Sequence, residues 1–188
     1  GGRIPEDESY LIDYMDEERV VSDIKRAREQ ADFVVVCPHW GTEYVMEADK
    51  YQKRWGELFL AQGVDLVIGA HPHVIQPIEW IVGEDGRKML VYYSLGNFVN
   101  GTNSTGDDVL ERIIGGMAQV TISKNEEGKV EITDYGVAPL VCHLDDRGSY
   151  TVYFLADYTD KLAKKNKYSE RISNFSVEKC QSVVDKVW

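Results

Sequence analysis

The sequence predicts an α/β protein, because two helix-and-strand pairs open the chain and strand pairs joined by tight turns follow them. Apolar residues recur at helical spacing and then in short runs through the first part of the chain, whereas Gly-containing turns separate strand-like segments in the later part. At 188 residues and 43% hydrophobic content, the chain is large enough for one well-buried core. We therefore expect a single domain spanning residues 1–188.

The opening elements follow in the order helix, strand, helix, strand. An acidic start and apolar residues at helical spacing predict a helix over 16–31, which is followed by a buried strand over 32–37. A second apolar face predicts a helix over 51–62, ended by Gly63 as a C-terminal cap, before a strand over 65–68. Short connections of this kind favour a parallel pair of strands with the helices packed on one face.

The later elements are predicted to be antiparallel hairpins followed by a helix. Gly-containing turns at 83–86 and 125–128 lie between strand-like segments, which is typical of hairpins. The expected segments are a hairpin of 74–82 with 88–93, a loop over 95–109, a hairpin of 116–123 with 129–137, a strand over 150–155 and a C-terminal helix over about 176–188.

The acidic composition limits the classes of partner. The chain carries 32 acidic and 21 basic residues, a formal net charge of -11. Nucleic-acid binding needs a positive surface that releases phosphate counterions, so we expect no nucleic-acid partner. No apolar stretch approaches the roughly 20 residues that cross a bilayer, and three widely spaced cysteines predict no disulfide framework. The start at Gly1, without an initiator methionine, indicates a piece of a longer protein.

Three of the four histidines lie in two short motifs, each directly after an apolar run. His39 follows the strand over 32–37, and His71 and His73 follow the strand over 65–68. Ligands gather where parallel strands end, and neutral imidazole is a common ligand of transition metals. We therefore predict that the three histidines form part of a metal site. The alternative is that they are turn histidines bonded to backbone groups.

The spacing of the second motif predicts how its rings are directed. Pro72 keeps His71 out of helical geometry. In an extended segment residues i and i+2 point the same way, so the rings of His71 and His73 are expected to reach one pocket.

Two further side chains border the predicted site, and we assign both to substrate binding. Glu43 lies in the first histidine motif; it could instead orient an imidazole or be a solvated loop carboxylate. Asn97 follows a third strand and could donate to a substrate oxygen, with a turn cap as the alternative. His143 is interpreted as structural, and the aspartate pairs at 107–108 and 145–146 as solvated turns. The sequence contains no motif for a nucleophilic serine or a glycine-rich phosphate loop.

Three motifs taken together resemble the CapA family of bacterial capsule and poly-γ-glutamate synthesis proteins. They are HWGTEY at 39–44, GAHPHVIQ at 69–76 and SLGNFV at 94–99, in this order and spacing. The family has a fold similar to calcineurin-like metallophosphoesterases, so the resemblance implies a layered α/β fold, a β-sandwich flanked by helices. The Asp, Gly-Asp and Asn-His elements of the family's first half have no counterpart before His39. The resemblance therefore covers the C-terminal portion of such a domain, without its N-terminal half.

The resemblance implies roles for individual residues. His39, His71 and His73 match histidines of a two-metal centre that activates water and clamps phosphoryl oxygens, so we expect them to be ligands and catalytic residues. Two divalent ions (Mn, Fe or Zn) are expected in the complete domain. This piece offers three histidines and no bridging carboxylate, so a metal-free piece is the alternative.

Two functions are compatible with these observations. The first is a capsule (poly-γ-glutamate) synthesis or export protein with a metal-dependent hydrolase site, which acts on a phosphoester or on the capsule polymer and needs the missing half. The second is a binding or assembly module of the capsule machinery that keeps the fold without turnover. A soluble α/β domain with turn histidines is the third interpretation. The resemblance also implies a cell-surface location, a membrane anchor outside this piece, and other capsule-synthesis membrane proteins as partners.

Overall fold

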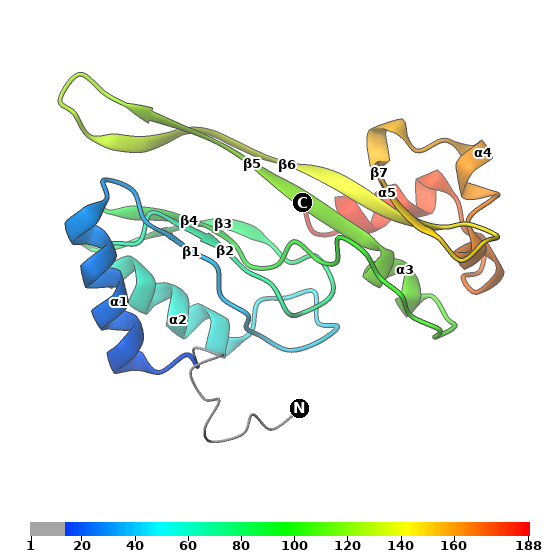
Figure 1. Cartoon of the computed structure of the whole chain (residues 1–188), viewed down its shortest axis with the longest axis horizontal. Coiled ribbons are helices and arrows are strands. Elements are labelled where there is room, and N and C mark those ends of the chain that lie inside the picture. Colours follow the sequence, from blue (N-terminus) through cyan, green and yellow to red (C-terminus); the bar gives the residue numbers. More distant parts are fainter. Residues whose placement is uncertain (1–13) are drawn as a thin grey trace.

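A computed structural model describes residues 14–188, and Figure 1 shows how its elements are arranged. In chain order they are α1 (Glu17–Gln30), β1 (Val35–Val36), α2 (Lys50–Ala61), β2 (Leu66–Ile68), β3 (Ile78–Val82), β4 (Lys88–Tyr92), α3 (Asp108–Ile113), β5 (Ile114–Lys124), β6 (Val130–Leu144), β7 (Tyr150–Phe154), α4 (Asp160–Ala163) and α5 (Val177–Asp185), with single 3-10 turns at Leu155–Asp157 and Lys167–Glu170. None of the described helices has the length and apolar character that a membrane span requires.

Side-chain caps set where the first two helices begin. The Asp16 carboxylate accepts a hydrogen bond from the Arg19 backbone N–H at 3.0 Å, and α1 starts at the residue after Asp16. Asp49 and Gln52 form a reciprocal capping box at the start of α2. Gly63 follows α2 with a φ of +87°, a left-handed conformation that a residue without a Cβ atom adopts at no steric cost. Both predicted helices are therefore confirmed, together with the cap that ends the second.

The first sheet contains the predicted parallel strands. Its order is β1-β2-β4-β3, in which β1, β2 and β4 are parallel and β3 is antiparallel to β4. β1 has only two residues, fewer than expected, because Val34 donates its N–H to the Asp65 side chain at 2.8 Å and Pro38 has no N–H to donate. Beyond Pro38 the pairing resumes as a single parallel bridge between His39 and Ala70.

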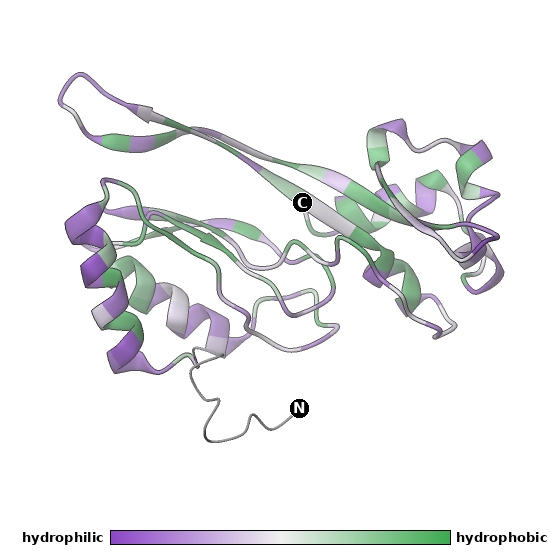
Figure 2. Cartoon of the chain, in the orientation of Figure 1, coloured by the Kyte–Doolittle hydropathy of each residue, from purple (hydrophilic) through white to green (hydrophobic). Residues whose placement is uncertain are grey.

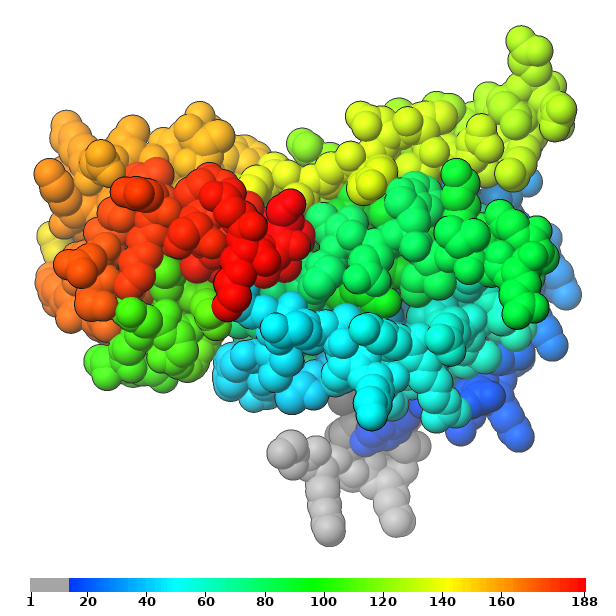
Figure 3. Space-filling model, turned by 180° about the vertical axis from the view of Figure 1, so that it is seen from behind, coloured from blue at the N-terminus to red at the C-terminus, as the bar shows by residue number. Residues whose placement is uncertain are grey.

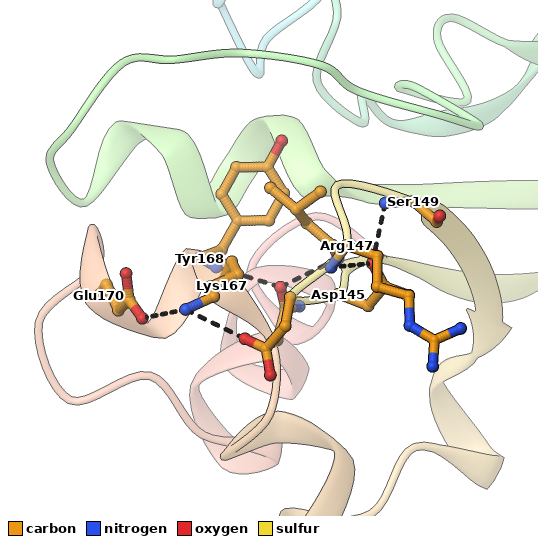
Figure 4. A network of polar contacts seen from close by, with 9 residues as sticks. Asp145, Arg147, Ser149, Lys167, Tyr168 and Glu170 are labelled. Atoms are coloured by element: carbon orange, nitrogen blue, oxygen red, sulfur yellow. Dashed lines mark hydrogen bonds and ion pairs between the residues drawn. The ribbon is translucent and has the colours of Figure 1, made fainter.

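The second sheet is antiparallel, in the order β5-β6-β7. Its hairpin is confirmed, and its strands are longer than predicted, since β6 alone has 15 residues. At the turn between β6 and β7, Asp145 Oδ1 accepts the N–H groups of Arg147 and Ser149, each at 2.8 Å (Figure 4). Lys167 pairs there with Asp146 at 3.0 Å. The aspartates at 145 and 146 are therefore turn residues, as expected.

Side chains that alternate along the first sheet define three layers. Val67 and Val91 pack against α1 and α2, whereas their neighbours Leu66, Leu90 and Tyr92 pack against the β5–β6 hairpin. The hydrophobic residues of α1 and α2 lie on the side that faces the sheet (Figure 2). Helices, first sheet and second sheet thus form successive layers (Figure 1). The predicted layered α/β fold is confirmed.

The C-terminal helix closes the other end of the second sheet. Ser176 caps α5, which packs in a separate hydrophobic cluster with α3 and the buried Tyr168. Trp188 Nε1 donates a hydrogen bond to the Gln76 carbonyl at 2.9 Å, so the end of the chain (red in Figure 3) lies against the segment that follows β2. The predicted helix near the C-terminus is confirmed, although it ends at Asp185, and Trp188 beyond it contacts the part of the chain that carries the second histidine motif.

Candidate metal centre

The histidines of the two motifs meet at one edge of the first sheet. His39 lies beyond β1 and forms the parallel bridge with Ala70, and His71 follows Ala70 directly. His71 Nδ1 lies 3.0 Å from His39 Nε2. The ring centroids of His71 and His73 are 6.1 Å apart. The structure therefore brings the three rings together at the ends of two parallel strands, as the sequence predicted.

A carboxylate joins the histidines. Glu43, His71 and His73 each offer one ligand atom, and these atoms lie within 4.8 Å of one another. The chain turns at Gly41, and the Tyr44 N–H then donates a hydrogen bond to the Pro72 carbonyl at 2.7 Å. This turn brings Glu43 back over the second histidine motif. Glu43 is therefore within reach of an ion held by His71 and His73, and the expected lack of a bridging carboxylate stays a prediction. Contact of Glu43 with substrate stays a prediction.

The backbone of the site adopts conformations that L-residues rarely take. Among the described non-glycine residues, positive φ angles occur at Tyr44 (64°), His71 (104°), His73 (61°) and Asn174 (49°). Three of these four residues border the site. The expected extended segment through Pro72 is therefore wrong, since the rings of His71 and His73 converge through two left-handed residues. Such conformations cost of order 1–3 kcal/mol each and persist where the surrounding contacts impose them, often at functional sites.

Asn97 fixes the orientation of His73. Asn97 Oδ1 lies 2.8 Å from His73 Nδ1, and Asn97 Nδ2 donates to the carbonyls of His73 at 3.0 Å and Arg112 at 2.9 Å. An amide oxygen only accepts hydrogen bonds, so His73 carries its proton on Nδ1 and leaves Nε2 free to bind a metal. Partners of this kind orient metal-binding histidines in proteins. Substrate binding by Asn97 stays a prediction, because both of its amide atoms have partners within the protein.

Two buried glutamines hold the loop that carries Glu43. Gln76 Nε2 donates to the carbonyls of Val45 at 2.8 Å and Glu47 at 3.0 Å, and its Oε1 accepts from Gln52 Nε2 at 2.7 Å. Both glutamines are fully buried, where an amide needs its hydrogen bonds to be made. The role of this pair was not predicted from the sequence, although Gln76 closes the second motif and a polar residue on the apolar face of a helix, such as Gln52, is a usable signal.

The donor set suits a divalent transition metal. Two imidazole nitrogens that bind one ion at about 2.1 Å lie roughly 3 Å apart. The observed distance between His39 Nε2 and His71 Nδ1 is 3.0 Å, which also suits a hydrogen bond between the rings. Burial, followed by the charges of His71 and His73, lowers the pKa of His39 below its ordinary value, which favours the neutral imidazole that metals bind. Imidazole with carboxylate fits Mn²⁺, Fe or Zn²⁺.

The surroundings distinguish this edge of the sheet from the opposite one. Tyr44 is 48% exposed and its ring stacks on that of His73, so an exposed aromatic side chain borders the histidines. Phe98, the residue after Asn97, is 66% exposed. A hollow of about 850 Å³ lies at the opposite edge, where β2 and β4 begin. Charged residues that line it pair with one another, as Arg28 and Asp65 do at 2.9 Å. His39, His71 and His73 therefore gather at one edge of the sheet, away from this hollow.

The fourth histidine lies in the second sheet. His143 is buried, and its Nδ1 lies 2.9 Å from the Tyr158 hydroxyl. This environment agrees with the structural role that the sequence suggested.

Fold and site together define a layered α/β protein with a candidate metal centre at the carboxyl ends of its parallel strands. The sequence matches the family "Bacterial capsule synthesis protein PGA_cap" over residues 3–102, which is more than half of the chain and includes all the residues of the candidate centre. The chain belongs to this family, which confirms the CapA resemblance.

Two relatives carry matching names. The chain is 36% identical over 120 residues to "PGA biosynthesis protein CapA" of Bacillus subtilis (strain 168), an alignment that covers 63% of this chain and 28% of the relative. It is 34% identical over 102 residues to "Capsule biosynthesis protein CapA" of Bacillus anthracis, covering 51% of this chain and 24% of the relative. The chain thus spans about a quarter of the length of each relative.

Proposed function

We propose that the chain contributes a metal-dependent hydrolytic site to a capsule biosynthesis protein of the cell envelope. The observation that carries this proposal is the group of Glu43, His71 and His73, whose ligand atoms lie within 4.8 Å of one another. Imidazole and carboxylate groups are the ligands of hydrolytic metal centres. The names of the relatives, which refer to capsule and PGA biosynthesis, support a substrate that is the capsule polymer or a phosphoester formed during its synthesis.

Each residue has a defined task in this proposal. Glu43, His71 and His73 hold a divalent ion, and His39, beside His71, completes its ligands or holds a second ion. A divalent ion bound there polarises a phosphoryl or carbonyl oxygen and lowers the pKa of water. Asn97 Oδ1 accepts a hydrogen bond from the His73 Nδ1–H, which keeps the proton on Nδ1 and leaves Nε2 unprotonated. The strained backbone at His71 and His73 holds both rings ready before any ligand arrives.

A complete two-metal centre draws on more of the protein than this chain. Two ions about 3.5–4 Å apart need more donors than one carboxylate and three imidazoles supply. The remaining ligands are expected from the rest of the protein, since the alignment covers only 28% of the Bacillus subtilis relative. A cell-surface location, a membrane anchor elsewhere in the protein and contacts with other capsule-synthesis membrane proteins belong to the same proposal.

A binding or assembly module without turnover is the second candidate. Tyr44 is exposed and stacks on His73, Phe98 is exposed one residue after Asn97, and exposed aromatic side chains are typical of surfaces that bind another protein. The distance between His39 and His71 also allows the two rings to pair without an ion. The two candidates differ in whether the site binds metal.

The metal content per chain distinguishes the candidates. After loading with Mn²⁺ or Zn²⁺ and removal of free metal, elemental analysis should find at least one ion per chain in the wild type. Glu43→Gln and His71→Ala should weaken metal binding by about tenfold or more, since each removes a ligand. Glu47→Gln is the matched control, because Glu47 is exposed on the same loop and lies outside the ligand group.

Two results would overturn the hydrolase proposal. One is a wild-type chain that binds no metal, and the other is equal metal binding by the wild type and all three variants. Either result leaves the assembly module as the better account. If metal binds as expected, hydrolysis of p-nitrophenyl phosphate by the full-length protein tests turnover.

A further inference from the structure

A positively charged side chain lies beside the candidate metal centre. Arg112 Cζ is 4.4 Å from the centroid of the Tyr44 ring, and that ring stacks on His73 with centroids 5.8 Å apart. Asn97, which orients His73, also donates to the Arg112 carbonyl at 2.9 Å. Arg112 is therefore attached to the site through both its backbone and its side chain, although it belongs to α3, outside the segment that matches the family.

The guanidinium of Arg112 is largely removed from water but only partly bonded. The side chain is 15% exposed, less than that of Arg28 or Arg54. Its Nη2 pairs with Asp108, and its buried Nε has no acceptor among the described residues. A guanidinium has five N–H donors, and a desolvated donor without an acceptor is unfavourable. Donors therefore remain for a further anion.

Among the described residues, Asp108 is the carboxylate that pairs with Arg112, and it is itself held weakly. Asp108 lies one turn earlier on α3, and its side chain is 58% exposed. Water solvates this exposed carboxylate almost as well as the guanidinium does, so Asp108 loses little when another anion takes its place on Arg112. An incoming anion can therefore replace Asp108 at small cost. The stacked Tyr44 ring meanwhile keeps the guanidinium in place.

We infer that Arg112 binds an anionic group of the substrate, a carboxylate or a phosphoryl group, next to the group that the metal centre holds. This inference rests on the proposed function and adds to it a residue that determines specificity. The planar donor fork of arginine matches the oxygens of carboxylates and phosphates. A chain with a net charge of -11 repels polyanions, so a fixed cation beside the site is needed to bring an anionic substrate to it.

Binding of two small probes to the metal-free chain tests this inference. Glutarate represents a carboxylate substrate and inorganic phosphate a phosphoryl one, and each is titrated while backbone amide NMR shifts are followed. At least one probe should bind the wild type saturably, and Arg112→Gln should weaken that binding by about tenfold or more. Asp108→Asn should tighten it about two- to fivefold, because it removes the competing carboxylate. The probe that binds better identifies the substrate class.

Matched variants separate anion binding from a structural role. Arg54→Gln removes an arginine of α2 that pairs with Glu17 on α1, and it should leave probe binding unchanged. Arg112→Lys keeps the charge without the fork and should recover part of the affinity. Urea unfolding midpoints of all variants show which of them remain folded.

Three results would overturn the inference. In the first, the wild type binds neither probe saturably. In the second, a folded Arg112→Gln variant binds the probes as well as the wild type does. In the third, Asp108→Asn binds them more weakly than the wild type. The metal content of Arg112→Gln should match the wild type. A loss of metal binding in Glu43→Gln is a separate result, so the inference and the proposed function can fail independently.

Discussion

Replacing Gln76 with methionine should destabilise the fold and weaken the metal centre together. The change keeps the side-chain volume and removes three hydrogen bonds of a fully buried amide, two to the carbonyls of Val45 and Glu47 and one from Gln52. Each such bond contributes about 1 kcal/mol net, so the free energy of unfolding should fall by roughly 3 kcal/mol. Gln52 keeps a longer contact with the Tyr93 carbonyl at 3.4 Å, which limits the loss on its side.

Gln76→Met should also weaken metal binding, because it releases the loop that carries Glu43. Val45 and Glu47 lie two and four residues after Glu43, and after the substitution this loop keeps the hydrogen bond from the Tyr44 N–H to the Pro72 carbonyl at 2.7 Å. Outer contacts of this kind typically change metal affinity by about 10- to 100-fold. We expect Gln76→Met to weaken Zn²⁺ binding within this range.

Urea unfolding at neutral pH and a Zn²⁺ titration measure the two effects. Gln181→Met is the control, because Gln181 is exposed on α5 and makes one hydrogen bond, to Asp185 at 2.8 Å. It should change stability by less than about 0.5 kcal/mol and leave Zn²⁺ affinity unchanged. A stability loss below about 1 kcal/mol for Gln76→Met would refute the hydrogen-bond argument. Unchanged Zn²⁺ affinity despite the full stability loss would refute the link between the loop and the centre.

Three further predictions concern single residues. Gly69→Ala places a methyl group against the Tyr93 carbonyl, so the free energy of unfolding, measured in urea, should fall by about 1–3 kcal/mol. An unchanged free energy of unfolding would contradict the close approach of the strands. Asn97→Ala frees the His73 ring and should weaken Zn²⁺ binding by about tenfold or more, and equal titration curves would speak against it. Burial lowers the pKa of His143, so the unfolded chain binds its proton more readily and stability should fall as the pH drops through about 6.5. His143→Gln removes that contribution, and urea unfolding at several pH values should show a shallower slope; identical slopes would exclude the role assigned to His143.

The sequence by itself determined most of the helices and strands, though not α3 and α4, and the edge at which function is expected. The helix caps at Asp16 and Asp49, the terminating Gly63 and the hairpin turns act over a few residues, so their outcome can be predicted without knowing the rest of the chain. The parallel order of the first strands likewise follows from short local connections. It places the ends of the two strands, and with them His39 and His71, side by side.

Only the tertiary structure decided how the site is completed. Glu43 reaches the histidines because its loop turns back and is held by Gln76, which lies 33 positions later in the chain. The left-handed conformation of His71 replaced the extended one that its spacing suggested. Arg112 reaches the same site from α3, through its contact with Tyr44. These arrangements arise from contacts between distant segments that outweigh local conformational preference, so periodicity and spacing along the sequence do not reveal them.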